Sequence, residues 1–349
     1  MDVVEALQRQ ATACEDLGSP MYAEVLRLLV DDYEVGGVTV EVLAEYDGRS
    51  FGEAIGLRLL AAVHGLVLSG ETPELAAFYP SVGGTWDAVL GWEAFKQTMQ
   101  SRIGEIRSLL AQPPQTNEVG RAASLYGGLL HLVDAVPLPV RLFEIGASGG
   151  LNLRADHFRY VADGTTYGAP DSPVVFDEAW TGKVPAADLR IAERVGCDIA
   201  PVDPLTPNGA LTLTSYVWPD MTDRLERLRG ALLVAQQVPA DIRPEDAVSF
   251  VNGMELSEGH VTVLWHSIMW QYLRRTDRTA IEERLAGLGK QATESNPLAH
   301  VRLEPHRVLT HGHNEDGWEY RIDLQTWPGG ELRRLGTATP HGQDLVWVS

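Results

Sequence analysis

The sequence feature that most constrains the fold is a change of hydrophobic pattern at Pro137. Before this residue, apolar side chains recur at helical spacing and predict helices over residues 21–33, 54–68, 86–110 and 116 to about 134. After it, short β-rich runs alternate with helical stretches. Because strand–helix alternation builds a parallel sheet covered by helices, we predict an α/β fold, with a doubly wound, mostly parallel sheet preceded by an N-terminal helical region.

The elements expected after Pro137 follow one another in a regular order. We predict strands over residues 140–145, 211–218, 261–265 and 300–303, and helices over residues 151–158, 221–237 and 276–288. Residues 319–326 and 331–337 meet at a Pro-Gly-Gly turn, which predicts an antiparallel terminal hairpin. The predicted domains are a helical region over residues 1–120 and an α/β domain over residues 121–349, with a turn-rich insertion at about 159–209.

Charge and composition narrow the classes of partner. The formal net charge of -20 disfavours binding to nucleic acid, because an acidic chain repels phosphate, and it favours a small-molecule substrate. Two cysteines, Cys14 and Cys197, make no disulfide framework. No apolar run has the length of a membrane span, and the first residues lack the pattern of a signal peptide, so we expect a cytoplasmic protein. Nothing in the sequence indicates the oligomeric state.

A glycine-rich loop joins the first predicted strand to its helix, in the segment V-R-L-F-E-I-G-A-S-G-G-L-N. Open α/β sheets bind ligands outside the carboxyl ends of their strands, and glycine lets a backbone approach a ligand closely. The helix start beyond the loop would suit a carboxylate. The dinucleotide fingerprint fails here, because Ser148 and Leu151 stand where it requires glycines. A glycine-rich turn without a ligand is the alternative.

This loop resembles motif I of the class I S-adenosylmethionine-dependent methyltransferases, an apolar strand followed by acid-x-Gly-x-Gly-x-Gly. Ser148 replaces the middle glycine of that motif. The resemblance implies a sheet of class I methyltransferase type and S-adenosylmethionine as the cofactor. It implies that the cofactor is held by Glu144, Gly146, Ser148, Gly150 and Asn152.

Two later acids fall in the order expected for the same family. Residues 212–218 end at Pro219-Asp220, and class I enzymes carry an acid that binds the ribose at the end of the second strand. Asp246, in Pro-Glu-Asp-Ala, resembles the segment beside the adenine. The resemblance therefore implies cofactor contacts for Asp220 and Asp246. Either residue could instead cap the helix that follows it, since caps require the same residue type.

Candidate catalytic residues follow the later strands. His266, at the end of the 261–265 strand, is the best candidate for a general base because imidazole titrates near neutrality; a hydrogen-bonded structural histidine is the alternative. Tyr272 could wall a cationic methyl centre, although such aromatics often belong to the core. Asp203 could reach the substrate from its loop, or that loop could be only rigid structure. The Asn/Asp-Pro-Pro-aromatic motif of nucleobase methyltransferases is absent.

Other polar residues carry weaker signals. Histidines gather near the C-terminal end, at His300, His306, His311 and His313. We expect a solvated loop there and no metal site, although zinc sites use such spacings. Residues 116–118 could cap a helix or approach the cofactor. His341 could approach the site or belong to a turn.

Nearly end to end, the chain also resembles an uncharacterised bacterial protein family, through stretches such as EIGASGGLN, RVGCDIAPVD, YVWPD and WHSIMWQY. That resemblance implies no particular reaction. The expected function is S-adenosylmethionine-dependent methyl transfer to a small acceptor of unknown identity. The alternatives are a non-catalytic binding or regulatory protein with the same fold, and an α/β enzyme that uses another nucleotide-like ligand.

Overall fold

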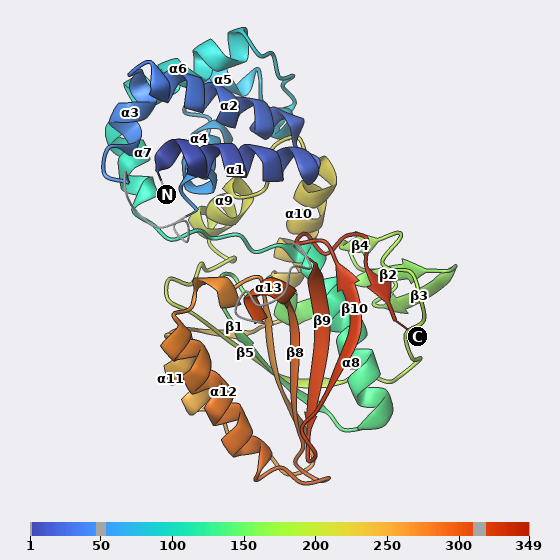
Figure 1. Ribbon diagram of the computed structural model, residues 1–349. Helices are drawn as coiled ribbons and strands as arrows, with labels where there is room; N and C mark the ends of the chain where they lie inside the picture. The colour runs from blue at the N-terminus through green and yellow to red at the C-terminus, as the bar shows by residue number, and fades with distance from the viewer. Residues whose placement is uncertain (1, 47–53, 310–318, 349) are drawn as a thin grey trace. The chain divides into compact units, whose positions relative to one another are not determined.

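The computed structural model describes residues 2–46, 54–309 and 319–348 and is shown in Figure 1. The chain forms two compact units. The first, which we call the helical unit, contains residues 1–116 and 206–226; the second, the α/β unit, contains residues 117–205 and 227–349. The segment 206–226 therefore belongs to the helical unit, although the sequence had suggested that it lies in the α/β domain.

The helical unit is built from amphipathic helices around one apolar core. Its elements are α1 (Val3–Asp16), α2 (Pro20–Glu34), α3 (Val38–Leu43), α4 (Ile55–Leu68), α5 (Pro73–Ala76), η2 (Pro80–Val82), α6 (Leu90–Ser101), α7 (Ile103–Leu110) and α9 (Pro207–Ser215). Helix α2 begins where the sequence predicts, with Ser19 as its cap and Pro20 at the first helical position. Helix α4 is buried on nearly all sides, which explains its lack of a polar face.

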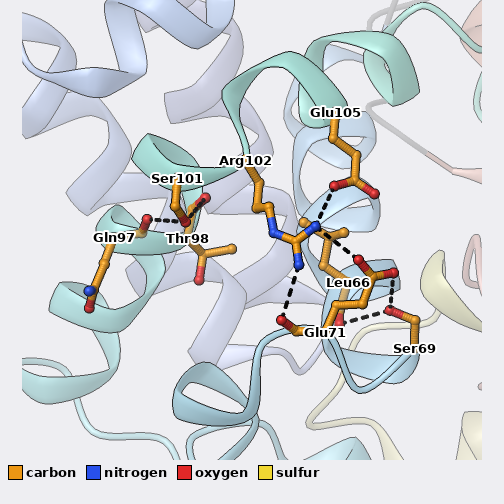
Figure 2. Close-up of polar contacts among 8 residues, drawn as sticks. All are labelled: Leu66, Ser69, Glu71, Gln97, Thr98, Ser101, Arg102 and Glu105. Atoms are coloured by element: carbon orange, nitrogen blue, oxygen red, sulfur yellow. Dashed lines mark hydrogen bonds and ion pairs between the residues drawn. The ribbon is translucent and has the colours of Figure 1, made fainter.

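Polar contacts on the surface of this unit join the end of α4 to the α6–α7 corner (Figure 2). Arg102 Nη1 donates to Glu71 at 2.9 Å and to Glu105 at 3.0 Å. Its Nη2 donates to the Glu71 carbonyl oxygen at 3.3 Å. All three side chains are partly exposed, so each ion pair contributes at most about 1 kcal/mol. The apolar core therefore supplies most of the stability of the unit.

A buried histidine links three segments of the same unit. His64, on α4, is fully buried; its Nδ1 lies 3.1 Å from the Ser215 carbonyl oxygen and its Nε2 lies 2.8 Å from Ser81 Oγ. Because a carbonyl only accepts, Nδ1 carries the proton and Nε2 accepts from the Ser81 hydroxyl. Burial lowers the pKa of His64 to about 4, so the ring is neutral at pH 7.

The strand predicted over residues 211–218 is wrong, because this segment belongs largely to helix α9. Thr206 caps the helix by accepting from Gly209 N at 3.0 Å, and Pro207 takes the first helical position. The helix then packs against α4. A local cap and a tertiary contact therefore outweigh the β propensity of the sequence LTLTSYVW.

The α/β unit contains an eight-stranded sheet in the described part of the chain, in the order β11-β10-β9-β8-β7-β1-β5-β6. Its strands are β1 (Val140–Ile145), β5 (Ile191–Asp198), β6 (Asp241–Pro244), β7 (Val261–Ser267), β8 (Leu298–Pro305), β9 (Tyr320–Trp327), β10 (Glu331–Ala338) and β11 (Val346–Trp347). Strands β6, β5, β1, β7 and β8 are parallel, and the rest are antiparallel. The architecture is therefore α/β and compatible with a Rossmann-like fold, and β9 and β10 confirm the predicted hairpin.

Helices cover both faces of this sheet, with α8 on one side and α11 and α12 on the other (Figure 1). The helical elements of the unit are η3 (Val119–Arg121), α8 (Ala122–Ala135), η4 (Leu151–His157), α11 (Ala247–Asn252), η5 (Trp270–Tyr272), α12 (Arg275–Gly289) and α13 (His306–Leu309). Helix α10 (Thr222–Gln237) contains the unit boundary between residues 226 and 227. Phe143, Ile145 and Leu264 belong to the apolar cluster that includes α11 and α12. Because neighbouring residues of a strand point to opposite faces, the residues next to these three on β1 and β7 face α8.

The predicted insertion at 159–209 includes β5, a strand of the main sheet that is paired on both sides. Strand β5 pairs in parallel with β1, so only the residues before it form an appendage. That appendage is a three-stranded sheet of β2 (Arg159–Ala162), β3 (Thr165–Gly168) and β4 (Val175–Phe176). Charged residues interrupt the apolar pattern of β5, so the sequence did not indicate a strand there. In the structure these charges are paired, Arg194 with Asp156 at 2.7 Å and Glu193 with Arg141 at 2.6 Å. No helix in the described ranges is long and apolar enough to cross a membrane.

Candidate functional site

The order in which the strands join the sheet reverses beside β1. From β1 the chain adds β5 and then β6 on one side, and afterwards β7 and β8 on the other. The direction of winding therefore reverses between β1 and β7. In open α/β sheets, ligands bind at such a reversal, outside the carboxyl ends of the strands. The carboxyl ends of β1 and β7 thus mark the candidate site, and both strands belong to the α/β unit.

The loop after β1 has a left-handed backbone at three alternate residues. The φ angles are 70° at Gly146, 51° at Ser148 and 65° at Gly150. Ser148 thus adopts a conformation that costs a side chain about 1–2 kcal/mol. The Ser148 amide donates to Asp198 Oδ2 at 3.0 Å, and the Val202 amide donates to the Ser148 carbonyl at 3.3 Å. The loop is therefore held in shape by the segment that follows β5.

The two glycines are required by packing as well as by their φ angles. A Cβ atom on Gly146 would lie 3.0 Å from the Cβ of Met269. One on Gly150 would lie 2.4 Å from Cδ1 of Ile242. Amides along the loop are already used, since Ala147 N donates to the Cys197 carbonyl and Gly150 N to the Ala147 carbonyl. The helix start expected to bind a carboxylate is the short 3₁₀ helix η4, so this expectation loses its structural support.

Glu144 lies at the winding reversal, on the α8 face of the sheet. Its Oε1 accepts from the Trp265 indole nitrogen at 3.1 Å, and only 3% of the residue is exposed. Its Oε2 has no hydrogen-bond partner among the described residues. Burial raises the pKa of Glu144 to about 8, and the Trp265 hydrogen bond together with the charges of Arg121 and Arg154 opposes the rise. Glu144 is therefore mostly protonated at pH 7.

The acid at the end of the second strand in the sheet is Asp198. Its Oδ2 accepts from Ser148 N, and its Oδ1 accepts from Ala200 N, each at 3.0 Å. Asp220, predicted for this position, instead belongs to the helical unit, where it accepts from Ser19 Oγ at 2.6 Å and from Met21 N at 3.0 Å. The prediction failed because residues 211–218 are not a strand. The acid that does end this strand, Asp198, lies in the RVGCDIAPVD stretch.

Residues before α8 also contact the loop. Asn117 Oδ1 accepts from Leu151 N at 3.0 Å, and Asn152 Nδ2 donates to the Glu118 carbonyl at 3.2 Å. Asn152 is buried, and its Oδ1 has no partner among the described residues. Arg121 donates through Nε to the Pro340 carbonyl at 2.9 Å. Asn117 and Glu118 thus lie beside the loop, which their capping pattern alone did not decide.

Arg121 also reaches the end of β7 and brings a third segment to this edge. Its Nη1 donates to the Ser267 carbonyl at 3.3 Å. A Cβ on Gly120 would lie 2.0 Å from the carbonyl oxygen of His341, so the Pro-His-Gly turn packs directly on this segment. His341 itself is buried. The Pro-His-Gly turn therefore packs against Gly120 and Arg121, next to the end of β7.

His266 faces away from Glu144. Successive residues of a strand point to opposite faces, and Trp265 points toward Glu144, so His266 lies on the face of α11 and α12. Its Nδ1 donates to Glu304 at 2.8 Å, and its ring stacks on Trp270 with centroids 4.7 Å apart. The residue is 0% exposed. The burial and the hydrogen bond of His266 thus fit a structural histidine, the alternative to a general base.

The remaining predicted residues lie in different settings. Tyr272 ends η5 and is about half exposed, at 49%. Asp203 is exposed and accepts from Leu205 N at 2.9 Å. Asp246 caps α11 by accepting from the amides of Val248 and Ser249, each at 3.0 Å. Hydrogen bonds from Ser249 lower the pKa of Asp246. Asp246 lies two residues after the end of β6 and is the helix cap that the sequence allowed.

Metal and thiol chemistry find little support. In the described ranges, no group of three or more His, Cys, Asp or Glu residues could hold a metal ion. His311 and His313 lie outside those ranges. Burial raises the pKa of the Cys197 thiol, which makes this residue a poor nucleophile.

Comparison with known proteins identifies a family and nothing finer. No curated protein and no solved structure shows a significant match. Residues 4–347 match a family described as an uncharacterized protein conserved in bacteria, DUF2332. Because the match spans almost the whole chain, the protein belongs to this bacterial family.

Proposed function

We propose that the α/β unit binds S-adenosylmethionine at the carboxyl end of β1, between the ends of β7 and β5, and transfers its methyl group to a small-molecule acceptor. The observation that carries the proposal is the loop after β1. It follows the buried acid Glu144, has three left-handed residues, and lies where the sheet reverses its winding. The overall charge of -20 supports a small acceptor over a nucleic acid.

The buried acids fit the cationic and hydroxyl groups of this cofactor. Glu144 Oε2 is buried and has no partner in the described part of the chain, and once Glu144 is ionised an ammonium group would supply one. Asp198 accepts one hydrogen bond on each oxygen, and each oxygen has a second lone pair for a ribose hydroxyl. We assign Asp198 the ribose role that the resemblance had implied for Asp220.

When bound, the cofactor supplies a sulfonium-activated methyl group, and its transfer needs alignment and exclusion of water without a covalent enzyme intermediate. Glu144, once ionised, would hold the ammonium, and the loop shape enforced by Asp198 would orient the cofactor. Tyr272, half exposed after β7, would line the acceptor side. His266 would take no direct part in the transfer, because its ring is buried on the opposite face of the sheet and bonded to Glu304.

Calorimetric titration with S-adenosylmethionine and S-adenosylhomocysteine tests the proposal. We expect micromolar binding, about 8 kcal/mol, that is lost in Gly146→Arg. Gly164→Arg is the matched control, since Gly164 has a similar left-handed φ, 73° against 70° at Gly146, but open space around it. Absence of binding in the folded wild type would refute the proposal and favour another nucleotide-like ligand. Binding without turnover of any acceptor would favour a regulatory protein.

A further inference from the structure

The turn after β7 has an unusual backbone. Ile268 has a φ angle of 52°, in the left-handed region that a β-branched side chain rarely adopts. Such a conformation costs about 1–3 kcal/mol and persists only where surrounding contacts hold it. One contact is the hydrogen bond from Ile268 N to the Leu303 carbonyl at 3.0 Å. Arg121 contributes a second, to the Ser267 carbonyl, and a buried carboxylate on β8 contributes further ones.

Glu304 gathers three donors on one oxygen. Its Oε1 accepts from His266 Nδ1 at 2.8 Å, from Met269 N at 3.0 Å and from Trp270 N at 3.2 Å. Both Glu304 and His266 are 0% exposed, and the imidazole stacks on Trp270. Hydrogen bonds to a charged group are stronger than neutral ones and gain further in a low-dielectric interior. Glu304 therefore joins two amides of the turn, those of Met269 and Trp270, to β8.

The turn places Met269 against the loop after β1. A Cβ atom on Gly146 would lie 3.0 Å from the Met269 Cβ and 3.2 Å from its Cγ. Met269 is half-buried, so part of its side chain remains accessible. Its thioether is flexible and polarisable, and it adapts well to a bound ligand.

We propose that Glu304 is a positioning residue that, through the β7 turn, holds Met269 as one wall of the ligand site above Gly146. Glu304 acts on the turn, and Met269 supplies an apolar contact to the ligand. The ligand contact rests on the proposed function. The positioning of Met269 does not, because it concerns the ligand-free protein.

Methyl-¹³C methionine NMR of the full chain, with S-adenosylhomocysteine as the probe, tests both steps. In Glu304→Ala we expect the Met269 methyl resonance to move and the Kd to rise about tenfold, as for one lost charge-assisted hydrogen bond. Glu304→Gln keeps an acceptor oxygen, so it should restore the resonance and bring the Kd to within about threefold of wild type. A merely structural glutamate would not produce this rescue at Met269.

Two methionine variants separate contact from general packing. Met269→Ala should raise the Kd about fivefold, because the ligand loses an apolar contact. Met254→Ala is the matched control, since Met254 is buried in the core of the same unit and its replacement should leave the Kd unchanged.

An unmoved Met269 methyl resonance in folded Glu304→Ala, or an unchanged Kd in Met269→Ala, would overturn the inference. If Glu304→Ala does not fold, Met269→Ala decides. If the wild type binds no probe, the proposed function fails, and the methyl resonance in Glu304→Ala still decides the positioning.

Discussion

Replacement of Glu144 by glutamine should make the stability of the α/β unit less sensitive to pH. Burial raises the pKa of Glu144 from 4.5 to about 8. Between these values the folded state binds a proton that the unfolded state has released, so wild-type stability falls as pH rises. Glutamine resembles the protonated acid, keeps an acceptor for the Trp265 indole, and does not titrate.

The expected magnitude follows from the size of the shift. At 1.36 kcal/mol per pKa unit, keeping Glu144 protonated costs the folded state about 3 kcal/mol at pH 7 and about 1 kcal/mol at pH 5. The free energy of unfolding of Glu144→Gln, relative to that of the wild type, should therefore rise by about 2 kcal/mol between pH 5 and pH 7. Taking the difference between the two proteins cancels the titration of other groups.

Amide hydrogen exchange measures this difference within the unit concerned. Exchange of the central β1 and β7 amides reports the opening free energy of the sheet, independently of the helical unit. Both proteins would be followed at pH 5, 6 and 7 after correction for intrinsic exchange. A difference between variant and wild type that stays constant across this range would refute the assignment of a raised pKa to Glu144.

The other predictions concern packing and a second buried group. Gly150→Ala should destabilise the protein by about 2 kcal/mol, because its Cβ would clash with Ile242 at a left-handed φ; Gly164→Ala, with similar φ but open space, should cost less than about 1 kcal/mol, as urea denaturation would show. His64, whose pKa falls from 6.5 to about 4, should make the helical unit lose about 3 kcal/mol as pH falls from 6.5 to 4, because the unfolded state takes up the proton first. Amide exchange in α4 would measure this loss, and its persistence in His64→Gln would contradict the assignment.

Local signals determined much of the α/β unit. The run VRLFEI forms β1 over the residues predicted, because its alternation and the glycines beyond it are encoded within a few positions. The same holds for the cap of α2 at Ser19 and for the left-handed loop at Gly146 and Gly150. The predicted strands at 261–265 and 300–303 correspond to β7 and β8 for the same reason.

Tertiary structure decided which of these residues meet. Residues 211–218 have strong β propensity, yet contact with α4 and the Thr206 cap make most of them helical, so Asp198 rather than Asp220 ends the second strand. The register of β7 against β1 decides which of its side chains face which side of the sheet. It places Trp265 on the same face as Glu144 and His266 on the opposite face. Glu304 is thirty-eight residues from His266 and reaches it only because β8 pairs beside β7. Such contacts depend on strand register and burial, which join distant segments and leave no periodic signal in the sequence.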